Sequence, residues 1–282
     1  SAGADFVVAI GGGSPMDAAK AIATLAVQER TDEEIFAGGY APVALPMAHV
    51  PTTAGTGSEV TPYSILTNDA KRTKTSITSP AMFPRLAYLD GKYMRDLPVA
   101  TTVNTAMDAF SHAVEGMLSR NATPLSDALA RESLRILYPL LSKTAGALTL
   151  EERDTLLYAS ALAGMTIAQS GTTAVHGMGY SLTYFYNIDH GRANGLLLGA
   201  TLRLCEKKGV PALQEILSAC GDTLGGVCAT IDALLGEREA IPAARLEEFA
   251  AAVSEKHIKK SKYEPTAEEV RVIFFTSLRT QK

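Results

Sequence analysis

Hydrophobic and polar positions follow two different patterns along the chain, and the change falls near residue 98. Before that point, short apolar runs are separated by clusters of glycine, proline and threonine, which is typical of strands joined by turns. A segment with helical character, PMDAAKAIATLAV, follows the first apolar run. We expect strands at residues 5–10, 47–50 and 86–89, and a hairpin that pairs residues 60–67 with 73–78.

After residue 98, apolar positions recur at the helical spacing of about 3.6 residues almost throughout. The expected helices cover residues 104–118, 124–141, 151–168, 172–186, 195–207, 211–220, 243–257 and 266–278. The pattern therefore predicts an α/β domain over residues 1–97, followed by an all-helical domain over residues 98–282.

Composition narrows the class of protein. The 282 residues carry a formal net charge of −4 without a basic stripe, so no nucleic-acid partner is expected. No apolar stretch reaches the ~18 residues of a membrane span. Cys205, Cys220 and Cys228 are too scattered for a disulfide framework and favour a reducing compartment. Because the first residues also lack the basic region of a signal peptide, we expect a cytoplasmic protein.

A glycine-rich loop, Gly11-Gly12-Gly13-Ser14, joins the first expected strand to a helix. Glycines allow close backbone approach to a ligand, and the N-terminus of a helix favours a pyrophosphate. We expect Ser14 to cap the helix, Pro15 to occupy its first turn, and Asp17 to cap or to accept a hydrogen bond from a ribose or amide. The alternative is an ordinary tight turn, because the motif is not G-x-G-x-x-G.

A second loop of small residues, PTTAGTGSE at residues 51–59, also follows an expected strand. Its hydroxyls and N–H groups can hold phosphate or ribose oxygens. The alternative is a turn whose Thr and Ser side chains cap the backbone. Two such loops in one α/β segment favour a dinucleotide ligand.

Four residues have the types and spacing of a metal site. Asp108 and His112 stand four apart on one helix face, and His176 and His190 bracket the segment HGMGYSLTYFYNIDH. One carboxylate and three imidazoles suit a divalent transition metal such as iron or zinc. Taken singly, each histidine is more often a structural residue, so the pairing of the two motifs carries the prediction.

Other residues near this pattern are given structural roles. Glu115 lies on the same helix face as the first two ligands, where we expect a surface ion pair, with a supporting role behind the ligands as the alternative. His190 is expected in a turn, where Gly191 lets the backbone approach the ion. His49 and His257 lie outside the pattern and are expected to be core or surface residues.

Four segments, GGGSPMDAAKAIA, PTTAGTGSE, DAFSHAVE and HGMGYSL…DHGRANG, resemble in this order the signatures of the iron-containing (group III) alcohol dehydrogenases. That family is related in fold to glycerol dehydrogenase and dehydroquinate synthase. The resemblance runs from about residue 5 to residue 200 and continues more weakly to the end. It implies an α/β domain that binds NAD or NADP, a helical domain that binds the metal, and an active site between them.

The resemblance also implies roles for individual residues. The metal ligands would be Asp108, His112, His176 and His190, with Fe2+ as the expected ion and Zn2+ compatible with the same set. Lys74 matches a lysine near the nicotinamide ribose. The residues expected at the pyrophosphate and nicotinamide side are Gly11, Gly12, Gly13, Ser14 and Asp17, and those lining the cofactor are Thr52, Thr53, Thr56 and Ser58.

Two departures from the family pattern affect the expected activity. Members carry a longer stretch ahead of GGGS, so we expect this chain to be N-terminally truncated, with an incomplete nucleotide-binding domain and exposed apolar sheet edges. Tyr180 stands where many members have the second His of an HxxxH motif. We expect Tyr180 to be catalytic, by relaying a proton or orienting the substrate.

The sequence therefore predicts a metal-dependent oxidoreductase that transfers a hydride between NAD(P) and a small primary alcohol or aldehyde, as a homodimer. One alternative is a lyase of the dehydroquinate synthase type, although the basic cluster that a phosphate-bearing substrate needs is not obvious. A second alternative is a truncated, non-catalytic remnant that binds metal but cannot hold NAD.

Overall fold

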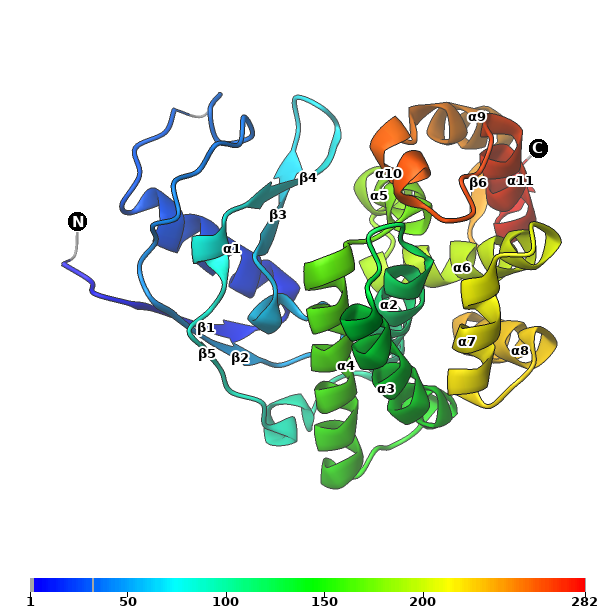
Figure 1. Cartoon of the computed structure of the whole chain (residues 1–282), viewed down its shortest axis with the longest axis horizontal. Helices are drawn as coiled ribbons and strands as arrows, with labels where there is room; N and C mark the ends of the chain where they lie inside the picture. The colour runs from blue at the N-terminus through cyan, green and yellow to red at the C-terminus, as the bar shows by residue number, and fades with distance from the viewer. Residues whose placement is uncertain (1–2, 32, 282) are drawn as a thin grey trace.

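The computed structural model describes residues 3–31 and 33–281, and it shows an α/β part followed by a helical part (Figure 1). The α/β part contains a three-stranded parallel sheet with the order β1-β2-β5 and a separate antiparallel hairpin. The sheet strands are β1 (Val7–Gly11), β2 (Met47–Pro51) and β5 (Leu86–Ala87), and the hairpin strands are β3 (Tyr63–Asn68) and β4 (Thr73–Thr78). Short 3-10 helices are η1 (Ser58–Val60), η2 (Pro80–Met82) and η3 (Gly91–Met94).

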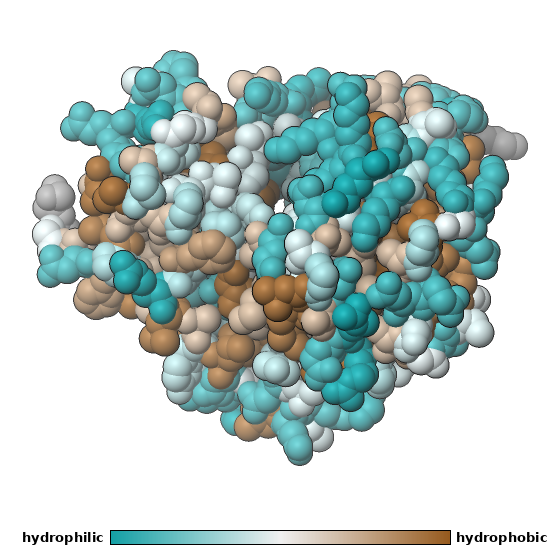
Figure 2. Space-filling model, viewed as in Figure 1, coloured by the Kyte–Doolittle hydropathy of each residue, from teal (hydrophilic) through white to brown (hydrophobic). Residues whose placement is uncertain are grey.

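Helix α1 (Gly13–Leu25) covers one face of this sheet. Ala9 of β1 points toward the helix and packs with Met16 and Ala19 in a small core. Successive side chains of a strand alternate between faces, so Val8 and Ile10 point the other way. These two side chains are 51% and 63% exposed, and apolar surface is visible on this side of the molecule (Figure 2).

The helical part is built around α2 (Val99–Leu118), which packs against α3 (Pro124–Leu141), α4 (Leu150–Ser170) and α6 (His190–Lys207). Because α2 has neighbours on several sides, nearly all of its residues are buried, polar ones included. The remaining helices are α5 (Ala174–Tyr186), α7 (Pro211–Cys220), α8 (Leu224–Leu235), α9 (Ala243–Ala252), α10 (Glu255–Lys260), α11 (Ala267–Ser277) and the 3-10 helix η4 (Ser142–Ala145). A two-stranded parallel pair, β6 (Ala240–Pro242) and β7 (Arg279–Gln281), joins the end of the chain to this part.

The structure corrects several expected boundaries. The single helix expected over 243–257 is two helices, because Val253 is extended and Ser254 caps α10 through the His257 N–H. Ser14 is not a cap, since α1 begins at Gly13 with Gly12 as its N-cap. His190 begins α6 and does not lie in a turn. Helix α8 and strands β6 and β7 were not predicted.

Over the described residues, no helix has both the length and the apolar composition needed to cross a membrane. Cys205, Cys220 and Cys228 are buried and unpaired, which agrees with the expectation of no disulfide framework.

Candidate metal and nucleotide site

Three helices bring the four predicted metal ligands together. Asp108 and His112 lie one turn apart on α2, His176 lies in the first turn of α5, and His190 is the first residue of α6. The Asp108 Oδ1 atom is 3.7, 3.8 and 4.0 Å from the Nε2 atoms of His112, His176 and His190. Ligand atoms of Asp108, His112 and His176 all lie within 4.8 Å of one another. The structure thus gathers the three imidazoles around one carboxylate.

Outer partners fix the orientation of two of these imidazoles. His112 Nδ1 is 3.2 Å from the carbonyl oxygen of Gly55, and His176 Nδ1 contacts the carboxylate of Glu115. Both partners accept hydrogen bonds, so each Nδ1 carries the proton and donates. Each Nε2 is then left with its lone pair facing the cluster, which is the tautomer that a metal ligand requires.

Glu115 lies inside the protein, and the expectation of a surface ion pair is wrong. Its side chain is fully buried, and its Oε2 accepts hydrogen bonds from the Thr173 backbone N–H at 2.8 Å and the Thr173 hydroxyl at 2.5 Å. Thr173 and His176, at the start of α5, contact Glu115 and help to cover its side chain. Glu115 supports His176 from behind, which was the alternative reading of the sequence.

Asn194 also belongs to the site, although we did not predict it. It follows His190 by one turn of α6, and its Nδ2 lies 3.1 Å from Asp108 Oδ1 and 3.2 Å from the Nε2 atoms of both His176 and His190. Three electron-rich atoms therefore converge on one amide group, while the amide oxygen has no hydrogen-bond partner among the described residues. A donor set of this kind, one carboxylate with imidazole lone pairs, fits a divalent cation.

The electrostatics of the cluster favour cation binding. Burial lowers the pKa of His176 well below its usual value, and the neighbouring imidazoles His112 and His190 lower it further. Burial also lowers the pKa of His190. For Asp108, burial raises the pKa, but the surrounding imidazoles and Asn194 outweigh it and the net pKa is lowered. Near neutral pH, His176 and His190 are thus neutral imidazoles beside an ionised carboxylate.

Comparison with protein families decides which class of metal site this is. A family model described as "Iron-containing alcohol dehydrogenase" matches residues 1–91, and one described as "Fe-containing alcohol dehydrogenase family, C-terminal" matches residues 102–274. The chain belongs to the iron-containing alcohol dehydrogenase family. Members of this family use Fe2+ and NAD(P), and the resemblance inferred from the four sequence segments is confirmed.

Individual relatives of this iron-containing alcohol dehydrogenase chain include lactaldehyde reductase of Escherichia coli (strain K12), which is 36% identical over 206 residues. That match covers 72% of this chain and 54% of the relative. The 1,3-propanediol dehydrogenase of Klebsiella pneumoniae is 35% identical over 232 residues, which cover 81% of this chain and 59% of that protein. The chain thus spans little more than half the length of these curated relatives.

Solved structures show the same fold. The iron-containing alcohol dehydrogenase of Thermotoga maritima superposes with a TM-score of 0.88 at 39% identity, covering 97% of this chain and 75% of that one. The sulfoacetaldehyde reductase of Bifidobacterium kashiwanohense, solved with NAD+, superposes with a TM-score of 0.89 at 28% identity, covering 98% and 77%. The expected fold class, an α/β domain followed by a helical domain, is confirmed.

The two small-residue loops of this family member pack directly on each other. A Cβ atom on Gly13 would lie 2.7 Å from Thr56 Cγ2, and one on Gly12 would lie 3.3 Å from the Thr53 hydroxyl. The Thr52 N–H donates to the Gly11 carbonyl at 2.9 Å. The contact between the loops therefore leaves no room for a side chain at Gly13 and little room at Gly12, whether or not a ligand approaches.

Asp17 and Ser58, both expected at the cofactor, are hydrogen-bonded to each other. The Ser58 hydroxyl donates to Asp17 Oδ1 at 2.6 Å, and the Ile65 N–H donates to Asp17 Oδ2 at 2.9 Å. Lys20, one turn further along α1, lies 3.7 Å from the same carboxylate. Asp17 thus joins α1 to the second loop and to β3, and its observed contacts hold the two loops together.

Tyr180 and Lys74 both lie near His190. The Tyr180 ring stacks on His190, with centroids 5.6 Å apart and an interplanar angle of 12°. Burial raises the pKa of the Tyr180 hydroxyl, and the carboxylates of Glu115 and Asp108 raise it further. Lys74 donates to the Thr67 hydroxyl at 2.8 Å, and its charge contributes to the lowered pKa of His190 after burial and the nearer groups.

His257, which we placed outside the site, is close to Tyr180. The two ring centroids are 6.1 Å apart in an edge-on arrangement, and a Cβ on Gly177 would lie 3.0 Å from the His257 side chain. No local motif marks this residue, because α10 reaches α5 only through the tertiary fold. His49 is fully buried in β2, as expected for a core residue.

Proposed function

We propose that this chain carries out metal-dependent hydride transfer between NAD(P) and a small primary alcohol or aldehyde. The observation that carries the proposal is the cluster of Asp108, His112, His176 and His190, with imidazole tautomers oriented for metal binding. Membership in the iron-containing alcohol dehydrogenase family supports this reading. Fe2+ is the proposed ion, with Zn2+ as the alternative for the same ligands.

The nucleotide half of the site is proposed to lie in residues 1–97, and the metal half in residues 98–282. The paired loops, with Gly11, Gly12, Gly13 and Ser14 on one side and Thr52, Thr53 and Thr56 on the other, would meet the pyrophosphate and the nicotinamide ribose. The Thr53 hydroxyl is buried without a partner among the described residues, which leaves it free for a ligand. Asp17 and Ser58 would position these loops, and Lys74 would approach the ribose.

The chain's own residues prepare the reacting atoms. A metal ion held by the four ligands would act as a Lewis acid on the oxygen of an alcohol or aldehyde. Because its pKa is raised, the Tyr180 hydroxyl stays protonated and donates a hydrogen bond; we propose that it orients the substrate oxygen. Glu115 and Gly55 hold His176 and His112 in place, so that the ligands do not reorganise during turnover.

The proposal is tested by titrating NADH into the protein and following nicotinamide fluorescence, with and without Fe2+. Binding together with NAD(H)-dependent interconversion of a short alcohol and its aldehyde is the expected result. The lyase alternative predicts nucleotide binding without net reduction of aldehyde. The non-catalytic alternative predicts metal binding by a folded protein that takes up no NADH, and that result would refute the proposal for this chain.

Two further properties are proposed with this function. Three free, buried cysteines support a cytoplasmic location, where thiols remain reduced. The apolar face of β1, with Val8 and Ile10 exposed, supports assembly beyond a monomer, and we propose a homodimer. Size-exclusion chromatography with light scattering gives the oligomeric state directly.

A further inference from the structure

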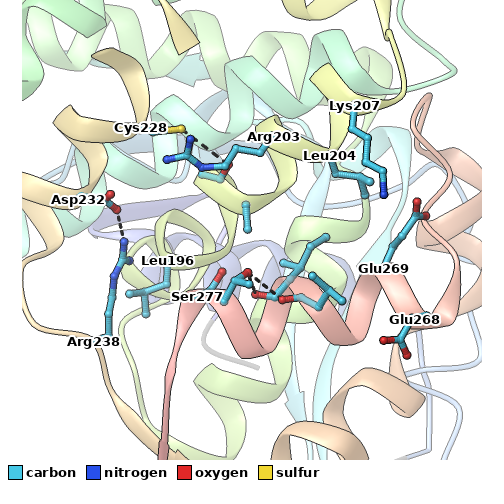
Figure 3. A pocket seen from close by; sticks show the side chains of 15 residues that line it. Leu196, Arg203, Leu204, Lys207, Cys228, Asp232, Arg238, Glu268, Glu269 and Ser277 are labelled. Atoms are coloured by element: carbon cyan, nitrogen blue, oxygen red, sulfur yellow. Dashed lines mark hydrogen bonds and ion pairs between the residues drawn. The ribbon is translucent and has the colours of Figure 1, made fainter. Parts of the chain in front are cut away.

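A pocket of about 450 Å³ lies along α6, beyond the turn that carries Asn194 (Figure 3). It is open to solvent on one side and is lined by α6, α8, α11 and Arg238, and it includes none of the predicted metal or nucleotide residues. Its volume lies within the range of about 300–1,000 Å³ found for small-molecule sites. Its floor is apolar and is formed by Leu196, Ala200, Leu204 and Ile273.

Two cations on one face of α6 stand over this floor. Arg203 and Lys207 are one helical turn apart, both line the pocket, and neither forms an ion pair or side-chain hydrogen bond with another described residue. The acidic groups of the pocket are already engaged, since Asp232 pairs with Arg238, Glu268 with Arg271 and Glu269 with Lys208. Arg203 and Lys207 are therefore the charged groups of this lining that have no ion-pair partner among the described residues.

Two buried polar atoms of the lining also lack partners. Ser277 is 3% exposed and its hydroxyl oxygen makes no hydrogen bond within the part of the chain that the structure describes. Arg238 uses one nitrogen for Asp232, while its Nη1 is buried and unsatisfied among the described residues. A buried donor without a partner loses the hydrogen bond that it made to water, so a ligand atom that accepts from such donors is favoured.

A second groove on the surface differs from this pocket because its arginines are paired. It is lined by Arg131 and Arg135, but these side chains pair with Glu215 and Glu132, so that groove has no unpaired arginine to offer an anion. We infer that the pocket between α6, α8 and α11 is a ligand site for a small carboxylate with an apolar body. The carboxylate would meet Arg203, Arg238 and Ser277, and the hydrocarbon would cover Leu196 and Ala200.

Octanoate tests this site when titrated calorimetrically into the metal-loaded protein. We expect saturable binding of octanoate and none of octylammonium, which has the same hydrocarbon and the opposite charge. Arg203→Gln should weaken octanoate binding by about tenfold or more, as expected for loss of one charged contact. Ala200→Trp should abolish binding, because the half-buried Ala200 lets an indole fill the pocket without disturbing the core.

Arg135→Gln, which removes an equivalent charge in the second groove, should leave octanoate binding unchanged. The thermal melting temperature of each variant shows that it is folded. Three results would overturn the inference: absence of octanoate binding, equal binding of octylammonium, or binding that survives both Arg203→Gln and Ala200→Trp. The last would place the bound octanoate elsewhere, for example at the metal.

Discussion

The backbone carbonyl of Gly55 lies 3.2 Å from Nδ1 of His112, and this contact joins the second small-residue loop to a proposed metal ligand. The approach depends on glycine, since a Cβ at this position would lie 2.7 Å from the carbonyl oxygen and the Cβ of Thr105. The loop therefore rests directly on α2. The nucleotide half and the metal half of the proposed active site are built as one unit.

Gly55→Ala should disturb the metal site, although Gly55 is not a ligand. The added methyl group meets backbone that cannot move aside cheaply, so the loop must shift and His112 loses its orienting partner. We expect metal affinity to fall by about tenfold or more, measured by competition with a chromophoric chelator. Gly146→Ala is the control, because its nearest contact would be an ordinary 3.6 Å. Unchanged affinity in Gly55→Ala would show that this contact has no role in metal binding.

Glu115→Gln removes the charge behind His176 while keeping the shape of the side chain. Because the carboxylate accepts from Thr173 and from the imidazole, the amide variant loses an acceptor and weakens the orientation of the ligand. Metal affinity should fall by roughly 10- to 100-fold. Glu132→Gln, which removes a surface carboxylate paired with Arg135, should bind metal as the unmodified protein does. If the two variants behave alike, Glu115 is only a packing residue.

Tyr180→Phe should lower kcat/KM by about tenfold and leave metal content unchanged, since the ring still stacks on His190 while the donating hydroxyl is lost. The raised pKa of the hydroxyl predicts the same loss at pH 6 and pH 8, because Tyr180 is protonated at both. Tyr186→Phe, on the same helix, serves as the matched control in steady-state assays. A loss that varied strongly with pH would indicate a titrating base in place of a hydrogen-bond donor.

His49 should make stability depend on pH below neutrality. Burial, with a smaller effect of Lys20, lowers its pKa from 6.5 to about 4. The unfolded chain therefore binds more protons between these pH values, and the free energy of unfolding rises with pH through that window. Each pH unit contributes at most about 1.4 kcal/mol. Replacing His49 by Leu should make this slope shallower in urea unfolding of metal-free protein, where His176 and His190 still contribute to it.

The buried carboxyl of Glu59 has the opposite effect on how stability depends on pH. Burial raises its pKa from 4.5 to about 7, so the folded state binds more protons between these values and stability falls as pH rises. Glu59→Gln should therefore steepen the rise of stability between pH 4.5 and 6.5, where the two effects overlap. Parallel pH profiles for the unmodified protein and both variants would contradict this assignment of the buried charges.

Local spacing was sufficient to predict which four side chains the fold brings together, and much of the fold itself. Asp108 and His112 share a helix face by periodicity alone, and the helices over 124–141 and 211–220 have the predicted bounds. Periodicity does not predict how helices that are far apart in the sequence pack against one another. Glu115 is buried because Thr173 and His176, at the start of α5, lie against it, and His257 meets Tyr180 because α10 returns to α5. The break between α9 and α10 has no glycine or proline to mark it.

The central claim is a single metal ion held by Asp108, His112, His176 and His190 beside the nucleotide loops. Anomalous diffraction at the iron edge, from crystals of protein loaded with Fe2+ and NAD+, tests it most directly. We predict one strong anomalous peak within bonding distance of all four side chains, with the nicotinamide close to it. A peak elsewhere, or no peak in a fully folded and loaded sample, would contradict the account.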